Sequence, residues 1–301
     1  MRSKRHIMLV GAVVASLALT VQACGSSSGT TSTSSGDSSD SATSTGSVSL
    51  PSSIASSGVL SVGAFFNYPP YTIASGNSVS GVEPDLISAV AEELGVKAEF
   101  HNLAFEAMIP SVLNGRSDVL IGPFADIAAR RKKVTFIDTL KVEMRMLVPA
   151  GNPDNIDPDD LCGTTAGESA GSQQLQLLKA DAKKCAAEGK PKMTVLTFTD
   201  PSESFLAVTS GRTDYTVQDP ALAAYTAKQN SKLELLDDHV MGDTPIAEGW
   251  VVDKDDPELA EAIVAAIKSL IADGTWQKIM TDNGLGDLAI EPPTINLKSA
   301  D

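Results

Sequence analysis

The chain has 301 residues, of which 42% are hydrophobic, and its 38 acidic side chains outnumber its 23 basic ones. The resulting net charge of −15 argues against nucleic acid as a partner, because nucleic acids are held by basic surfaces. Apart from one run near the N-terminus, no apolar stretch is long enough to span a bilayer.

The N-terminus carries the features of a secretory signal. Three basic residues among the first five precede an apolar run from Ile7 to about Val21, which is short for a membrane span. Residues 1–23 are therefore predicted to be a signal peptide, whose removal would take the net charge from −15 to −18, because it holds three basic residues and no acids. The run ends in Val-Gln-Ala-Cys24, which resembles a bacterial lipobox, so Cys24 is predicted to carry fatty acids such as palmitate. An ordinary signal cleaved near Ala23 is the alternative.

The next segment is almost entirely Ser, Thr and Gly from residue 25 to residue 49. Such a composition has too little apolar surface to offset the entropy of an ordered chain. We therefore expect residues 24–56 to be a flexible tether that holds the folded protein at the outer face of the cell membrane.

The rest of the chain alternates short apolar runs with segments of helical periodicity, which is typical of an α/β fold with parallel strands. The clearest helix start is at Asp200, where an N-cap, a Pro at the first helical position and Glu203 follow one another. The predicted elements, in chain order, are strand Val59–Ala64, a helix from Glu83 to Gly95, strand Val96–Phe100, helix Phe105–Leu113, strand Asp118–Ile121, an extended segment Glu143–Val148, a strand at Thr164 and Thr165, helix Ser172–Cys185, strand Met193–Phe198, a helix from Asp200 to Ser210, strand Tyr215–Gln218, an extended segment Glu248–Asp253 and a helix from Asp256 to Asp273.

Two cysteines remain besides the one at the lipobox. In an oxidising location an even pair predicts a disulfide, here between Cys162 and Cys185. Closing this loop would stabilise the protein by roughly 3 kcal/mol. Two reduced cysteines in the core are the alternative.

One phrase of the sequence occurs twice. NGRSDVLIG at residues 114–122 returns as SGRTDYTVQD at residues 210–219, and each copy follows a predicted helix and leads into a predicted strand. The repetition predicts an α/β protein with two Rossmann-like lobes joined by two hinge crossings. The expected boundaries are residues 57–143 and 250–301 for lobe 1 and residues 144–249 for lobe 2, with crossings near residues 143–148 and 246–253.

Ligands of open α/β sheets gather beyond the carboxyl ends of the strands. Beyond the first copy of the phrase the chain reaches Arg130, and the second copy ends at Asp219. One lobe would offer a cation and the other a carboxylate, which suits the two poles of a zwitterion. The alternatives are that Arg130 belongs to a solvated basic run and that Asp219 only caps the helix after Pro220.

Five longer segments carry a more specific signal, namely VGAFFNYPPYTI, GVEPDLISAVAEELGV, DVLIGPFADIAARRKKVTFID, DPSESFLAVTSGRTDYTVQD and GWVVDKDDPELAEAI. In this order they resemble the family 3 extracellular solute-binding proteins, the amino-acid receptors of ABC importers, and the likeness runs from about residue 57 to residue 287. The resemblance implies a type II periplasmic-binding-protein fold, an amino acid or similar zwitterion as ligand, and an ABC permease as partner. It also implies a monomer that needs no cofactor and is not an enzyme.

The resemblance implies roles for individual residues. It assigns the ligand's carboxylate to Arg130 and the ligand's amino group to Asp219. The other positions that it implies are the aromatic walls Tyr68 and Phe105 and the polar loop Gly171, Ser172 and Gln173.

Four positions depart from the pattern of the family. Phe65 stands where receptors for basic amino acids have an acidic residue. Gly122 and Pro123 stand where the family often has Ser or Thr, and Ala125 stands where it has a hydroxyl residue. The side-chain pocket is therefore expected to be more apolar than in those receptors, although aromatic walls also hold a guanidinium by cation–π contact.

Two other functions are weighed against the receptor. A secreted dehydratase-like enzyme could use Glu168 and Asp219 as an acid/base pair, and an extracellular sensor could report the ligand without transporting it. No residue pattern favours either function. No metal site is expected, because His101 and His239 lack companions at ligand spacing.

Overall fold

A computed structural model describes residues 49–76 and 78–296, leaving out the side chains of residues 123, 237–245, 287, 290 and 291. All of these residues lie in one compact unit, Gly46–Asp301. The signal peptide, the lipidated Cys24 and most of the predicted tether lie outside the described residues, so those expectations stay predictions.

The described chain alternates helices and strands as the sequence predicts. The helices are α1 (Ser52–Ser57), α2 (Val82–Glu93), α3 (Phe105–Leu113), α4 (Ala128–Arg131), α5 (Gln173–Ala187), α6 (Pro201–Thr209), α7 (Pro220–Gln229), α8 (Pro257–Ala272), α9 (Thr275–Asp282) and the 3-10 turn η1 (Gly286–Leu288). The strands are β1 (Val59–Ala64), β2 (Asn67–Tyr68), β3 (Thr72–Ser75), β4 (Ser78–Ser80), β5 (Lys97–Asn102), β6 (Val119–Ala125), β7 (Val134–Pro149), β8 (Thr165–Ser169), β9 (Thr194–Phe198), β10 (Thr216–Gln218), β11 (Leu233–Asp253) and β12 (Ala289–Ile295).

The principal sheet has the strand order β10-β7-β11-β6-β1-β5, and β12 also pairs with β7. Strand β1 is parallel to β5 and β6, whereas β11 is antiparallel to β6 and β7. A parallel pair, β8 and β9, forms a separate sheet, and a bridge between Ala166 and Tyr215 connects β8 to the segment before β10. We use lobe 1 for α1–α4, β1–β6, α8, α9 and β12, and lobe 2 for β8–β10 and α5–α7.

The two crossings are longer than the sequence predicts. Strand β7 has 16 residues and β11 has 21, so that each runs through both lobes. The half of β7 near Ile137 pairs with the end of β11 and with β12, and the half near Leu147 pairs with the start of β11 and with β10. The predicted fold class, two α/β lobes with two crossings, is confirmed.

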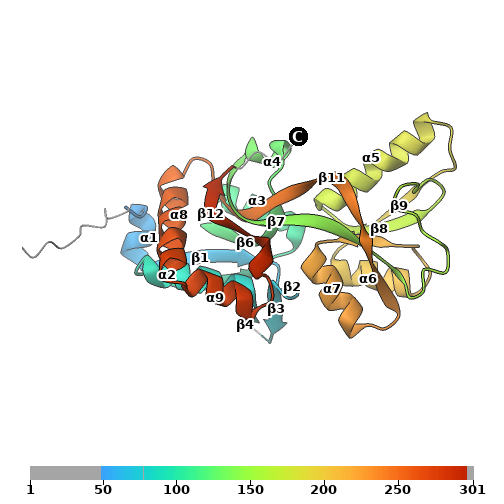
Figure 1. The fold of residues 1–301 in the computed structure, drawn as a ribbon. Helices are drawn as coiled ribbons and strands as arrows, with labels where there is room; N and C mark the ends of the chain where they lie inside the picture. The colour runs from blue at the N-terminus through green and yellow to red at the C-terminus, as the bar shows by residue number, and fades with distance from the viewer. Residues whose placement is uncertain (1–48, 77, 297–301) are drawn as a thin grey trace, which may run out of the picture. The chain divides into compact units, whose positions relative to one another are not determined.

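Helices cover both faces of the sheet in lobe 1. On β6, Val119 and Ile121 belong to the core cluster under α2 and α8, whereas Leu120 belongs to the cluster that contains Met108 of α3. This alternation follows from the two-residue period of a strand. Figure 1 shows α8, α2 and α9 gathered beside β1 and β6. No helix of the described residues is long and apolar enough to cross a membrane.

The repeated phrase has the same structural role in both lobes. In the first copy, Asp118 Oδ2 accepts a hydrogen bond from Ser61 N at 2.7 Å, and in the second, Asp214 Oδ2 accepts one from Thr165 N at 2.6 Å. The glycine of each copy follows the preceding helix in the left-handed region, with φ of 69° and 70°. Each Asp thus ties its own strand to the neighbouring parallel strand, which explains why the phrase recurs.

Two features of the fold in residues 52–80 were not predicted from the sequence. Residues 52–57 form α1, and Ile54 is only 3% exposed within the core, so the tether does not extend to residue 56 as expected. Residues 67–80 form the small antiparallel sheet β2-β3-β4. The predicted disulfide is confirmed, because Cys162 and Cys185 are bonded with their Cα atoms 5.6 Å apart.

Candidate functional site

The two charged residues chosen from the sequence each make hydrogen bonds between the lobes. Arg130, in α4 of lobe 1, donates from Nη1 to the carbonyl of Ala125 and from Nη2 to the carbonyl of Gly171 in lobe 2, both at 3.0 Å. Burial lowers the pKa of Arg130 from its ordinary value, yet a guanidinium stays protonated in proteins. Arg130 is therefore a cation at the junction of the lobes rather than part of a solvated basic face.

Asp219 is the N-cap of α7 and is fully buried. Its Oδ1 accepts hydrogen bonds from the backbone N–H of Ala221 at 2.8 Å and from the Tyr71 hydroxyl of lobe 1 at 2.7 Å. Its Oδ2 is buried, and none of the described residues hydrogen-bonds to it. Burial raises the pKa of Asp219 to about 6. The capping interpretation is thus correct, and the unpartnered Oδ2 remains available to a ligand that donates hydrogen bonds.

Two adjoining cavities share a wall made by Phe65, Tyr68 and Phe105. The larger has a volume of about 30 Å³ and extends into lobe 2, and the smaller has a volume of about 20 Å³ and lies within lobe 1. The Phe105 ring stacks on Phe124 with ring centroids 5.0 Å apart. The remaining residues of the larger cavity are Glu168, Ser169, Ser172, Gln174, Pro201 and Gln218, and those of the smaller are Thr72, Met108, Ile121, Gly122 and Phe124.

The polar loop of lobe 2 begins helix α5. Ser172 is its N-cap, accepting a hydrogen bond at Oγ from Leu175 N at 3.0 Å, and it lines the larger cavity. Gln173 does not line either cavity, although its Oε1 is buried and has no hydrogen-bond partner. Gln174, which sequence reasoning did not select, lines the larger cavity instead.

Pro123 and Ala125, which depart from the family pattern, lie in β6 of lobe 1. The side chain of Pro123 lies outside the described residues. Ala125 is buried and contributes its carbonyl to Arg130, so its role is that of the backbone and not of its methyl group. The neighbouring Arg131 is bonded to Asp126 at 3.0 Å, which assigns the two adjacent arginines to different partners.

Sequence reasoning missed most of the negative charge around the site. Glu168 was considered only as part of an enzyme, and Glu83 and Glu248 were not considered, yet all three are buried. Burial raises the pKa of Glu83 and of Glu168 to about 7 in each case. For Glu168, a usable signal was its place shortly after the predicted strand at Thr164 and Thr165, because ligands of α/β sheets gather beyond the carboxyl ends of strands.

The hydrogen bonds of these carboxylates separate their roles. Glu83 accepts from the indole N–H of Trp250, which fixes it within lobe 1. Glu168 Oε1 accepts from the Thr216 hydroxyl at 2.6 Å and from Gln218 Nε2 at 3.0 Å, whereas Oε2 accepts from Ser169 N at 3.1 Å. A carboxylate oxygen can accept more than one hydrogen bond, so Glu168 can still accept a donor from the cavity that it lines.

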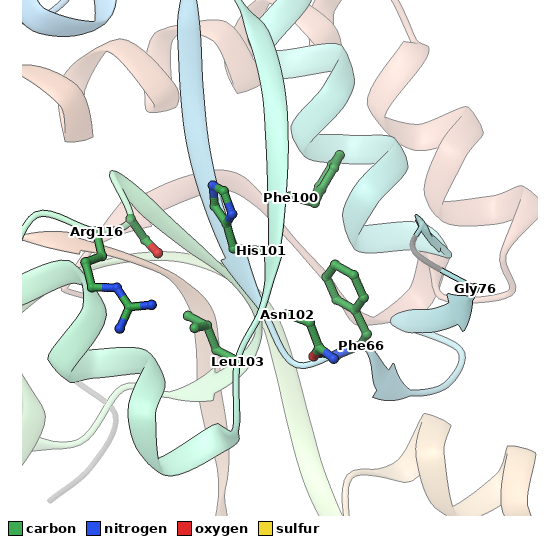
Figure 2. Close-up of a pocket in the computed structure, with 8 residues that line it drawn as sticks. Phe66, Gly76, Phe100, His101, Asn102, Leu103 and Arg116 are labelled. Atoms are coloured by element: carbon green, nitrogen blue, oxygen red, sulfur yellow. Dashed lines mark hydrogen bonds between the residues drawn. The ribbon is translucent and has the colours of Figure 1, made fainter.

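A wider hollow, of about 600 Å³, lies elsewhere along β5, the edge strand of the principal sheet. Figure 2 shows Phe66 and Phe100 on one side of that strand and His101 and Leu103 on the other. Because its walls come from both sides of an exposed strand, this hollow does not enclose a ligand. The two smaller cavities are the better candidate site, because the larger of them is lined by residues of both lobes. Neither Arg130 nor Asp219 is among the residues that line them, although Gln218 and Ser172 are close neighbours in sequence of Asp219 and of the Gly171 that Arg130 contacts. Among the described residues, no group of three or more His, Cys, Asp or Glu side chains could hold a metal ion.

Comparison with known proteins gives a consistent result. The model of the bacterial extracellular solute-binding proteins, family 3, matches residues 60–284. The arginine-binding protein ArgT of Corynebacterium glutamicum is 28% identical over 250 residues, which cover 82% of this chain and 81% of that protein.

Two solved structures are also similar. An ancestral arginine-binding protein bound to arginine is 32% identical, with a TM-score of 0.68, and the match covers 75% of this chain and 98% of that one. An ancestral amino-acid-binding protein, a precursor of cyclohexadienyl dehydratase, is 30% identical, with a TM-score of 0.65 and coverage of 76% and 97%.

Proposed function

The chain belongs to family 3 of the bacterial extracellular solute-binding proteins, and we propose that it binds an amino acid between its two lobes and delivers it to an ABC permease. The observation that carries this proposal is that Arg130 of lobe 1 and Asp219 of lobe 2 each have a hydrogen-bond partner in the opposite lobe. The first offers a guanidinium from lobe 1, and the second offers an unpartnered carboxylate oxygen from lobe 2. A zwitterion would meet an opposite charge at each of its poles, and each charge-assisted bond contributes roughly 1.5 to 3 kcal/mol.

The hydrogen bonds between the lobes support a site that is completed by closure. Arg130 reaches the Gly171 carbonyl and Tyr71 reaches Asp219, so residues of both lobes define the position of each charged group. Binding energy that depends on both lobes favours the state in which they are together. Tyr68, Phe105 and Phe65 supply the walls against which the ligand's side chain packs.

We propose an amino acid with a cationic side chain as the first ligand to test. Arginine is the ligand named for ArgT and for the ancestral protein described above. Phe65 removes the acid that such receptors are expected to have in lobe 1, but Glu168 brings a carboxylate to the same cavity from lobe 2. Aromatic rings beside a carboxylate suit a guanidinium, which stacks on rings and donates hydrogen bonds at its edge.

We also propose that the protein is a monomeric lipoprotein, held outside the cell by Cys24 and the Ser/Thr/Gly tether. Labelling with a palmitate analogue, in the wild type and in Cys24→Ala, tests this. Label that remains on the variant, or released protein that carries no lipid, would contradict the anchor.

We propose that the protein is not an enzyme, although one ancestral relative is described as a precursor of a dehydratase. Glu168 accepts hydrogen bonds from Thr216, Val217 and Gln218 within lobe 2, which holds its carboxyl group in one position. Turnover of prephenate-type acids in an absorbance assay would contradict this view.

Isothermal titration calorimetry across the twenty amino acids tests the proposed function. L-Arginine is expected to bind with a Kd in the micromolar range or below. If no amino acid binds more tightly than about 100 μM, which corresponds to roughly −5.5 kcal/mol, the protein is not an amino-acid receptor.

A further inference from the structure

Glu248 occupies an unusual place in the long strand β11. It lies opposite Leu140 of β7 and opposite Ala125 of β6, whose carbonyl accepts a hydrogen bond from Arg130. The register of β11 with β7 shifts directly after Glu248, and the register with β6 shifts after Gly249. The next residue, Gly249, passes so close to β7 that a Cβ atom would meet the Ile137 carbonyl oxygen at 2.0 Å. Such irregularities re-aim side chains next to functional sites. The strand is therefore deformed at the position of a buried acid.

The Glu248 side chain is buried but unsatisfied. It is 2% exposed, and no described residue hydrogen-bonds to its Oε2, as is also true of Asp219 Oδ2. A buried carboxylate oxygen without a donor is costly, so native proteins rarely keep one without a purpose. The charge of Asp219 adds to the effect of burial and raises the pKa of Glu248 further.

Several charged groups of the candidate site act on Glu248. Burial is the main cause that raises its pKa, Asp219, the N-cap of α7, and Glu83 of α2 raise it further, and Arg130 of α4 lowers it. Burial also raises the pKa of Tyr68 and of Tyr71, and the charges of Asp219 and Glu248 raise both further. Arg130 donates hydrogen bonds to the carbonyls of Ala125 and Gly171. These hydrogen bonds do not go to Asp219 or Glu248.

We propose that Glu248 is a ligand-binding residue that forms, together with Asp219, a two-carboxylate receptor for the ammonium group of the bound amino acid. This inference rests on the proposed function, since it assigns a further residue to the same site. An ammonium group has three N–H donors, which is enough for both unpartnered oxygens.

A proton balance follows from this arrangement. Two adjacent buried carboxyl groups do not both ionise in the empty site, so the pair holds a proton. When the ammonium group enters, that proton leaves to the solvent and both carboxylates face a cation. Affinity should therefore rise with pH over the range in which the empty pair titrates, by up to about tenfold per pH unit for one proton released.

The experiment measures the number of protons that are released when L-arginine binds. L-Arginine is titrated into the wild type, Glu248→Gln and Glu261→Gln between pH 6 and 8, in phosphate and in Tris, whose different heats of ionisation report the protons released. Glu261 is an exposed residue of α8 and provides a matched control. The wild type and Glu261→Gln are expected to release up to about one proton, and Glu248→Gln to release fewer and to bind about tenfold more weakly at pH 8.

Modified ligands separate the proposal from its main rival, in which Glu248 neutralises Arg130. L-Arginine amide lacks the α-carboxylate, and N-α-acetyl-L-arginine lacks the ammonium group. On the proposal, Glu248→Gln weakens L-arginine and its amide alike and leaves the acetylated ligand unchanged. Tighter binding of the acetylated ligand by Glu248→Gln would overturn it, as would equal proton release by Glu248→Gln and the wild type.

Failure of the proposed function and failure of this inference give different experimental results. If the wild type binds none of the twenty amino acids, the proposed function fails and this inference fails with it. If Glu248→Gln does not fold, carboxyl ¹³C titration of the wild type decides the matter. Two coupled carboxyl groups that titrate in the empty protein and lose that titration with L-arginine support the proposal, and unchanged titration overturns it.

Discussion

The Tyr71 hydroxyl donates a hydrogen bond to Asp219 Oδ1 over 2.7 Å, and both side chains are fully buried. Because Oδ1 also accepts two backbone N–H groups at the start of α7, the carboxylate is held in one orientation with Oδ2 left over. A residue of lobe 1 thus helps to orient the carboxylate of lobe 2 that we propose binds the ligand.

Replacing Tyr71 with Phe should weaken amino-acid binding by about fivefold to tenfold, the loss expected for one hydrogen bond to a charged group. The hydrogen bond lowers the pKa of Asp219, so its removal leaves more of this carboxyl protonated near neutral pH. The deficit should therefore be larger at pH 6.5 than at pH 8.5. Calorimetry of Tyr71→Phe at both pH values checks this, with Tyr225→Phe as the matched control. A deficit that does not change with pH would contradict the orienting role.

Replacing Arg130 with Ala should weaken binding of any α-carboxylate ligand by at least about 100-fold, because a charge-assisted pair is lost. Arg131→Ala should leave Kd unchanged, because Arg131 is bonded to Asp126. It should lower the melting temperature instead, since Asp126 is fully buried and would lose an ionic partner. Equal losses of affinity in the two variants would mean that the wrong arginine has been assigned to the ligand.

The ligand-free protein should be more stable at pH 5.5 than at pH 8. Burial raises the pKa of Glu83 and Glu168 from 4.5 to about 7, so the native state holds their protons at pH values where the unfolded chain has lost them. The stability that this adds is fully present below pH 4.5 and is lost as the pH rises through 7, and is on the order of 3 kcal/mol for each group.

Melting temperatures measured from pH 5 to 8 check this, because ordinary exposed carboxyl groups titrate near pH 4 and change little in that range. Glu168→Gln should show a shallower decline, whereas the exposed Glu261→Gln should follow the wild type. A melting temperature that rises with pH, or an identical decline in Glu168→Gln, would contradict the account.

Removing the disulfide with Cys162→Ala and Cys185→Ala together should lower the free energy of unfolding by roughly 3 kcal/mol. Denaturant unfolding of the double variant, compared with the wild type, measures the difference. Adding a thiol reductant should bring the wild type close to the variant and leave the variant itself unchanged. A wild type that is insensitive to reductant in the unfolding experiment would show that its cysteines are not bonded.

Local patterns of the sequence predicted the elements well because most of them are determined by local chemistry. Asp200, Pro201 and Glu203 define the start of α6, where Asp200 caps Ser202 N at 2.8 Å. The repeated phrase predicted two equivalent helix-to-strand transitions, because each Asp serves the backbone of an adjacent strand. Arg130 and Asp219 followed from what comes after those strands.

Features that depend on the tertiary fold were missed. Glu83 and Glu248 lie far apart in the sequence and resemble ordinary surface acids there, and only the folded chain buries them. The length of β11 was missed because its residues 237–245 contain no continuous apolar pattern. Helix α1 was missed because six residues rich in Ser give almost no periodicity, and Ile54 alone fixes it to the core.

The central claim is that Arg130 of lobe 1 and Asp219 of lobe 2 hold the two poles of one amino acid. Calorimetry with L-arginine on the wild type, Arg130→Ala and Asp219→Asn tests it most directly. We expect a Kd of micromolar or below for the wild type and a loss of at least about 100-fold in each variant, with N-α-acetyl-L-arginine binding the wild type poorly. Unchanged affinity in either variant, or no binding of any amino acid by the wild type, would contradict the account.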